Sequence, residues 1–245
     1  MKLLVSVRDA IEASAALEGG ADIIDAKDPL SGALGAVTLE TFRDIHTCVA
    51  GTRQVTAALG DASEEADTAR VADAFVRAGA GLVKIGFAGI ASRARVAALL
   101  AAAQDGASAR GGVIATAYAD ADRVGSLDPF GIVDAAARAG AAGVLLDTAD
   151  KRGPGLRDLI PPAVLRTWVE TAREARLTVA LAGKLSVDDF GYASDAGADV
   201  VGVRGAACDA GRTGHVIAAR VRELRSALVR RSTPALEPDP VSAFE

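Results

Sequence analysis

The chain has 245 residues, of which 50% are hydrophobic, 24% charged and 4% aromatic, and its formal net charge is −5. This length suits one large domain or two small ones, and the apolar half of the chain excludes overall disorder. The acidic balance, without a cluster of Lys and Arg among aromatic residues, indicates no nucleic-acid partner. Every run of about 18 residues carries a charge, and the N-terminal apolar run is too short for a signal peptide, so we expect no membrane partner.

Cysteine usage adds to this picture. Cys48 and Cys208 lie far apart and form neither a disulfide framework nor a metal-ligand spacing. Nucleotide-binding fingerprints are also missing from the sequence. We therefore expect a cytoplasmic protein that uses no metal and no other cofactor.

Four segments repeat the same order of features: a helix end, a Gly-Ala pair, and an apolar run rich in Val, Ile and Leu. Glycine directly after a helix is a common C-cap, and apolar runs of this length are typical of buried parallel strands. Four further apolar runs lie between these junctions. The eight predicted strands span residues 3–7, 22–27, 54–59, 82–86, 113–119, 144–148, 178–182 and 200–204.

The stretches between the strands have helical spacing and helix-start signals, such as Ser63 before two glutamates and Asp128 before Pro129. Eight strands alternating with eight helices predict a single (β/α)8 TIM barrel, an α/β fold, over residues 1–230. A doubly wound open sheet is the alternative, but the turn after the first strand lacks a Gly-rich motif. Residues 231–245 contain three prolines without periodicity and predict a short, disordered tail.

Lysine is rare in this chain, since five of its 27 basic residues are lysines and the others are arginines. Because arginine serves wherever any cation suffices, each lysine is a candidate for a position that needs an amine able to lose its proton. Active sites of barrels lie where the strands end. The lysines at or just beyond predicted strand ends are Lys27, Lys84, Lys151 and Lys184.

Two carboxylates accompany these lysines. Asp25 shares a strand face with Lys27, and Asp147 ends the strand before Lys151. A neutral lysine amine can form a Schiff base or accept a proton, which near pH 7 requires lowering its usual pKa of ~10.4 by about three units. A neighbouring ammonium and partial burial can supply that shift. A lone strand-end lysine fits an anion clamp equally well, and the carboxylates fit structural salt bridges.

Glycine-rich turns follow the seventh and eighth predicted strands, where barrels often bind phosphate. Small residues allow backbone N–H groups to approach an oxyanion, and Arg204 or Arg212 could add a guanidinium. The predicted phosphate-binding and substrate-binding residues are Gly183, Lys184, Arg204, Gly205 and Ala206.

Seven motifs resemble the (5-formylfuran-3-yl)methyl phosphate synthase family, also called 4-(hydroxymethyl)-2-furancarboxaldehyde-phosphate synthases. They occur in order at residues 19–29 (GGADIIDAKDP), 32–36, 83–86 (VKIG), 117–126, 146–151 (LDTADK), 180–183 and 201–208. The resemblance thus covers nearly everything except the tail. It implies a TIM-barrel lyase that condenses two molecules of glyceraldehyde 3-phosphate into a furan aldehyde phosphate, with loss of phosphate and water. This product is a precursor of methanofuran-type one-carbon carriers.

The resemblance also implies roles for single residues. The family's Schiff-base lysine falls on Lys27 and its proton-accepting lysine on Lys84, with Lys151 as an alternative base. Asp25, Asp147 and Lys151 match further polar positions of the motifs. The sequence departs from the family's pattern at residue 184, where a small hydroxyl residue is usual, and at residues 152–155.

Two other functions stay open at this point. A class I aldolase or isomerase acting on another sugar phosphate would use the same lysines and loops. A barrel that binds a phosphorylated ligand without converting it is the non-catalytic alternative, although strand-embedded lysines paired with carboxylates would be needless for binding alone. In each case we expect a small phosphorylated molecule as the ligand and a homo-oligomer as the assembly.

Overall fold

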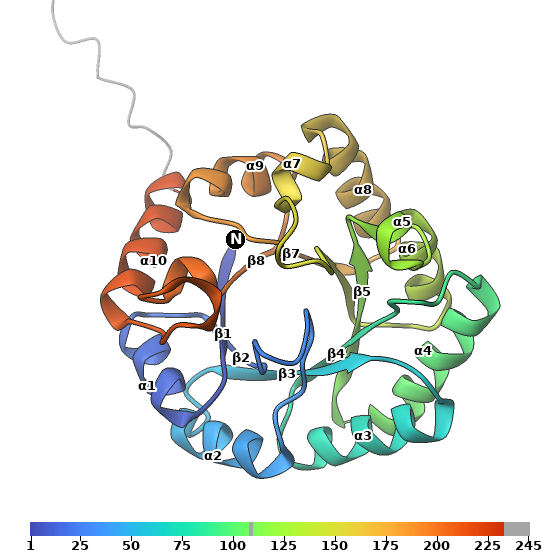
Figure 1. The fold of residues 1–245 in the computed structure, drawn as a ribbon, viewed down its shortest axis with the longest axis horizontal. Helices are drawn as coiled ribbons and strands as arrows, with labels where there is room; N and C mark the ends of the chain where they lie inside the picture. Colours follow the sequence, from blue (N-terminus) through green and yellow to red (C-terminus); the bar gives the residue numbers. More distant parts are fainter. Residues whose placement is uncertain (108–109, 233–245) are drawn as a thin grey trace, which may run out of the picture.

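The computed structural model describes residues 1–107 and 110–232, and these residues form a closed parallel barrel (Figure 1). Each strand pairs with the next one along the chain, and the last strand pairs with the first. The predicted TIM barrel is confirmed, and each predicted strand is found with small shifts at its ends. The strands are β1 (Lys2–Val7), β2 (Ile23–Ala26), β3 (Gln54–Asp61), β4 (Leu82–Gly86), β5 (Gly112–Tyr118), β6 (Gly143–Asp147), β7 (Thr178–Leu181) and β8 (Val200–Val203).

Helices surround the strands as an outer ring (Figure 1). Their apolar faces pack on the outward side chains of the barrel and form the main core, in which Trp168 and Phe42 are fully buried. None of the helices in the described ranges is long and apolar enough to cross a membrane. The helices are α1 (Ala10–Glu18), α2 (Leu39–Val49), α3 (Glu65–Arg77), α4 (Arg93–Ala107), α5 (Ala121–Val124), α6 (Pro129–Arg138), α7 (Leu156–Leu159), α8 (Pro162–Glu174), α9 (Phe190–Asp195) and α10 (Ala218–Ser232).

The ends of the helices test the predicted start signals. Asp128 caps α6, because its carboxylate accepts the N–H of Gly131, as the sequence predicts. The start predicted at Ser63 is wrong by one residue, since Glu64 occupies the N-cap of α3. Helix α10 continues to Ser232, so the first two residues of the predicted tail belong to this helix. The other residues of the predicted tail, 233–245, lie outside the described part of the chain.

Side chains inside the barrel change from apolar to polar along the strands. Early in the strands, Leu4, Ile23 and Val200 pack together and close the interior. Toward the C-terminal ends, buried polar residues such as Ser6 and Lys84 take over. The fold therefore gathers its buried charges at one end of the barrel, where the loops after the strands meet.

Candidate active site

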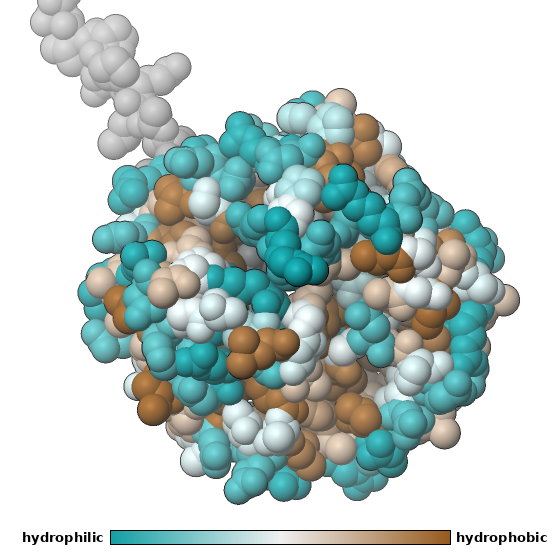
Figure 2. Space-filling view, viewed as in Figure 1, coloured by the Kyte–Doolittle hydropathy of each residue, from teal (hydrophilic) through white to brown (hydrophobic). Residues whose placement is uncertain are grey.

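A cavity of about 300 Å³ opens at the C-terminal end of the barrel. In Figure 2, hydrophilic residues gather beside the centre of this face, over the loops that follow β6 and β8. The structure brings the four predicted lysines together in this cavity, with Asp147, Gly183, Gly205 and Ala206. Its charged lining residues are Lys27, Lys84, Asp147, Lys151, Lys184, Arg204 and Arg212.

Asp25 lies behind this lining, where it holds Lys84. The parallel register places Ser6, Asp25 and Thr56 side by side on β1, β2 and β3. The carboxylate of Asp25, which is fully buried, accepts the hydroxyls of Ser6 (2.9 Å) and Thr56 (2.7 Å). The amine of Lys84 lies 2.5 Å from the same carboxylate. Lys84 is therefore fixed in place by a carboxylate that two hydroxyls orient.

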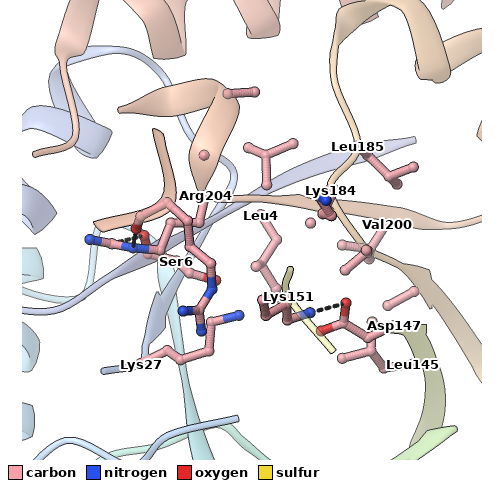
Figure 3. A pocket seen from close by; sticks show the side chains of 18 of the residues that line it. Leu4, Ser6, Lys27, Leu145, Asp147, Lys151, Lys184, Leu185, Val200 and Arg204 are labelled. Carbon is pink, nitrogen blue, oxygen red and sulfur yellow. Dashed lines mark hydrogen bonds and ion pairs between the residues drawn. The ribbon is translucent and has the colours of Figure 1, made fainter. Parts of the chain in front are cut away.

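A second pair links β6 to the loop after it. Lys151 donates to the carboxylate of Asp147 at 2.6 Å (Figure 3), and the N–H of Thr148 donates to the same oxygen at 2.8 Å. Burial by itself would raise the pKa of Asp147. The charges of Lys151 and Lys27 and these hydrogen bonds outweigh burial and bring this pKa below its usual value. Asp147 is thus held as an anion in the floor of the cavity.

Lys27 differs from these two lysines because its amine forms no hydrogen bond or ion pair with any residue in the described ranges. It extends into the cavity, as Lys151 does from another side (Figure 3), and is 7% exposed. Burial lowers the pKa of Lys27 to about 7, opposed by Asp147 and assisted by the charges of Lys151 and Lys84. Near neutral pH a large share of Lys27 is therefore an uncharged amine, which is the form that acts as a nucleophile.

Arg204 has a structural task that the sequence analysis did not foresee. Its guanidinium pairs with Glu12 of α1 and donates to the carbonyls of Ser6, Arg212 and Gly214. These bonds use all five N–H groups of the side chain. The guanidinium has no donor left for a phosphate, so we assign Arg204 to holding the loop after β8 against α1. The phosphate roles of Gly205 and Ala206 stay predictions.

Lys184 and Arg212 present positive charge at the mouth without a carboxylate partner among the described residues. Lys184 donates to the carbonyl of Gly153 at 2.6 Å, and Arg212 donates to the carbonyls of Pro29 and Gly32. Lys184 also has a left-handed backbone (φ 64°), a conformation that L side chains adopt at a cost. Because carbonyls are neutral, both cations remain able to attract an anion.

Further polar residues lie behind the cavity lining and hold the elements around the site. Tyr118 donates to Asp61 at 2.7 Å, and burial together with Asp61 raises the pKa of this phenol far above its usual value. The carboxylate of Asp120 accepts the N–H groups of Ala149 and Asp150 and so fixes the loop that carries Lys151. The residues that the sequence analysis missed are Ser6, Glu12, Thr56 and Asp61. For Ser6, Thr56 and Asp61 the available signal was a polar residue inside an apolar strand, whereas Glu12 lies on helix α1.

The fold and this cavity define a TIM-barrel protein with a lysine-rich, electropositive site at the mouth of the barrel. Residues 3–225 match the family model described as 4-HFC-P synthase. The (5-formylfuran-3-yl)methyl phosphate synthase of Methanopyrus kandleri is 39% identical over 239 residues, which cover 96% of this chain and 98% of the relative. That of Methanothermobacter thermautotrophicus is 37% identical, covering 93% and 99%. The chain belongs to the (5-formylfuran-3-yl)methyl phosphate synthase family.

Solved structures of other proteins share the fold. A 3-hexulose-6-phosphate synthase is 24% identical with a TM-score of 0.62, covering 93% of this chain and all of that one. A phosphoribosyl anthranilate isomerase from Thermus thermophilus is 14% identical with a TM-score of 0.63, covering 94% and 100%. At these identities the likeness supports the barrel architecture alone.

Proposed function

We propose that this protein is a lyase that condenses two molecules of glyceraldehyde 3-phosphate into (5-formylfuran-3-yl)methyl phosphate. The atoms balance when one phosphate and two water molecules leave. The observation that carries the proposal is the buried amine of Lys27, which has no partner among the described residues and a pKa of about 7. The names of the homologous synthases support the product.

The charge of the cavity fits two phosphorylated substrates. Asp25 neutralises Lys84, Asp147 neutralises Lys151, and Glu12 neutralises Arg204. Lys184 and Arg212 remain as uncompensated cations at the mouth, although the whole chain carries a net charge of −5. We propose that these two side chains, together with the backbone around Gly183 and Gly205, bind the phosphate groups.

The first chemical step begins at Lys27. Its neutral amine adds to the aldehyde carbon of one triose phosphate and forms a carbinolamine, which loses water to give an iminium ion. The oxygen that leaves as water must be protonated, and the ammonium of Lys151, fixed by Asp147, lies on the same cavity to supply that proton. Lys27 thereby becomes a covalent electron sink.

The second step uses the iminium ion to form the new carbon–carbon bond. The iminium acidifies the neighbouring C–H bond, and Lys84 accepts this proton after passing its own proton to Asp25 across the 2.5 Å contact. The resulting enamine carbon attacks the aldehyde carbon of the second triose phosphate. Loss of phosphate and two water molecules then gives the furan ring, still joined to Lys27 as an imine, and its aromaticity makes this step irreversible. One water molecule hydrolyses the imine, which releases the furan aldehyde and restores the amine of Lys27. Lys151 is the alternative base.

The test is incubation of the purified protein with glyceraldehyde 3-phosphate alone. We expect a furan aldehyde chromophore and one released phosphate per furan, and no furan from Lys27→Arg, whose guanidinium cannot add to an aldehyde. A different sugar phosphate as product would favour the aldolase or isomerase alternative. Absence of any borohydride-reducible adduct would favour a non-catalytic binding protein.

We also propose that the reaction proceeds without a metal or another cofactor, that the protein assembles as a homo-oligomer, and that it acts in the cytoplasm. The covalent amine of Lys27 supplies the electron sink that a metal ion provides in other enolate-forming enzymes. Loss of turnover in EDTA that a divalent ion restores would contradict the first of these proposals.

A further inference from the structure

One side of the cavity is built from small apolar residues. Ala180, Ala182 and Gly202, which we call the β7–β8 recess, line the cavity together with Leu4 and Val200. The register places Gly202 next to Leu4 on β1, and Ala180 next to Val200. In Figure 3, Val200 lies on the far side of the cavity from Lys27. The recess is therefore an apolar wall of a cavity whose other lining residues are mostly polar or charged.

The glycine at position 202 is not explained by the fold. Its φ is outside the left-handed region. A Cβ atom there would meet Ala182 and Leu4 at 3.5 Å, which is ordinary contact. By contrast, a Cβ at Gly86 would come within 3.0 Å of Asp61 and Tyr118, so packing requires that glycine. Glycine in a strand is unfavourable relative to alanine. Neither backbone conformation nor packing therefore requires a glycine at position 202, and its missing side chain leaves space on the cavity side of β8.

The burial of the Lys27 amine indicates which part of a ligand occupies the space beside Gly202. A nucleophile that is 7% exposed and has no partner among the described residues needs a ligand whose carbon atoms reach it inside the cavity. The cations that attract phosphate, Lys184 and Arg212, lie at the mouth and leave the interior to the carbon skeleton. An apolar wall suits that skeleton increasingly well as hydroxyls leave as water and the ring becomes flat.

We infer that the β7–β8 recess, opened by Gly202, holds the carbon skeleton of the second triose phosphate and the nascent furan ring, and that Gly202 sets the size of this acceptor. The inference rests on the proposed function for the identity of the acceptor. In this inference Gly202 affects only how the second triose phosphate is positioned. It has no part in the formation of the bond between Lys27 and the first triose phosphate. Filling the recess should therefore separate the two halves of the reaction.

The test compares Gly202→Ala and Gly202→Val with the unmodified chain. With glyceraldehyde 3-phosphate and borohydride, both variants should give the adduct at Lys27 within about twofold of the normal rate. Furan formation should fall at least about tenfold in the alanine variant and further in the valine variant, as expected for added methyl groups in a tight pocket. The melting temperature of Gly202→Ala should be unchanged or higher.

Gly155→Ala is the matched control, because its Cβ would also make ordinary contacts (3.4 Å or more) and Gly155 is outside the cavity lining. It should change neither half-reaction. Normal furan formation in Gly202→Val would overturn the inference, and so would equal loss of adduct and furan with a lower melting temperature, which would indicate a structural glycine.

The affinity for the furan product tests the recess by a measurement that does not depend on turnover. Calorimetry should show the Kd of (5-formylfuran-3-yl)methyl phosphate raised at least about tenfold in Gly202→Ala, with the Kd of inorganic phosphate unchanged. An unmodified chain that forms no furan contradicts the proposed function, whereas an unchanged Kd for the furan contradicts the recess.

Discussion

Lys27 differs from Lys84 and Lys151 because those two lysines form ion pairs with carboxylates and Lys27 forms none among the described residues. Asp25 binds Lys84 and Asp147 binds Lys151, so each of these amines is held by a buried carboxylate. Lys27 is buried beside both pairs without a carboxylate of its own. The same residue type is therefore an unpaired, buried amine at position 27 and a carboxylate-bound amine at positions 84 and 151.

The rate of adduct formation at Lys27 should rise with pH. The neutral amine is the reacting form, and its pKa of about 7 places the midpoint near neutrality. Initial rates of cyanoborohydride trapping with glyceraldehyde 3-phosphate, measured between about pH 5.5 and pH 9, provide the check. A midpoint near the ordinary lysine value of ~10.4 would show that burial does not activate this amine.

Replacing Lys27 by methionine should stabilise the fold, and more so at low pH. The pKa falls from 10.5 in the unfolded chain to about 7 in the folded protein. Below pH 7 the buried charge destabilises the folded state fully, and this penalty shrinks as the pH rises toward 10.5, since the unfolded chain then binds the extra proton. Urea unfolding should give Lys27→Met an advantage of up to about 5 kcal/mol at pH 6 and less at pH 9. An advantage that grows with pH would contradict the assigned pKa.

The sequence places lysines and carboxylates at the strand ends, but it does not say which carboxylate binds which amine. Lysine stood out because arginine occupies nearly all other basic positions. The pairing of Lys84 with Asp25 depends on two strands between which β3 lies, and the hydroxyls of Ser6 and Thr56 depend on the register of neighbouring strands. The sequence therefore leaves Asp25 and Asp147 as alternative partners of Lys84, and it gives no indication of the two hydroxyls.

At the scale of elements, the buried pair of Arg204 and Glu12 holds the loop after β8 against the start of α1. The side chains are 4% and 1% exposed, and Arg8 adds a second cation at 3.2 Å from Glu12. This arrangement connects two segments at opposite ends of the chain and shapes the mouth between them.

Glu12→Gln should lower the free energy of unfolding by about 3 kcal/mol, because it leaves a buried guanidinium without its counter-charge. Chemical unfolding measures this difference. Asp73→Asn, which removes the exposed partner of Arg77 in α3, is the control and should change stability by less than about 0.5 kcal/mol. Equal effects of the two substitutions would show that the Arg204 pair does not hold the mouth.

Prediction of the elements succeeded where local patterns are long. The eight strands follow apolar runs, and helix α6 follows its Asp-Pro start. Helices α5 and α7 have four residues each, too few for helical periodicity to show. The task of Arg204 was missed because its partner Glu12 lies 192 positions away.

The whole molecule combines a negative net charge with a positive cavity. Distant acidic residues on the surface are screened by salt, whereas the uncompensated cations at the mouth act on a ligand at close range. The KM for glyceraldehyde 3-phosphate should therefore rise several-fold when salt is raised from ~0.05 M to ~0.5 M, while kcat changes little, because the buried pairs are shielded. Steady-state kinetics at both salt concentrations test this, and an unchanged KM would contradict phosphate binding by Lys184 and Arg212.

The most direct test of the whole account is peptide mapping after borohydride reduction in the presence of glyceraldehyde 3-phosphate. Mass spectrometry should find one reduced adduct, on the peptide that contains Lys27, and none in Lys27→Arg, which should remain folded. An adduct on Lys84 or Lys151, or an adduct that persists in Lys27→Arg, would show that another lysine is the nucleophile and would contradict the central claim.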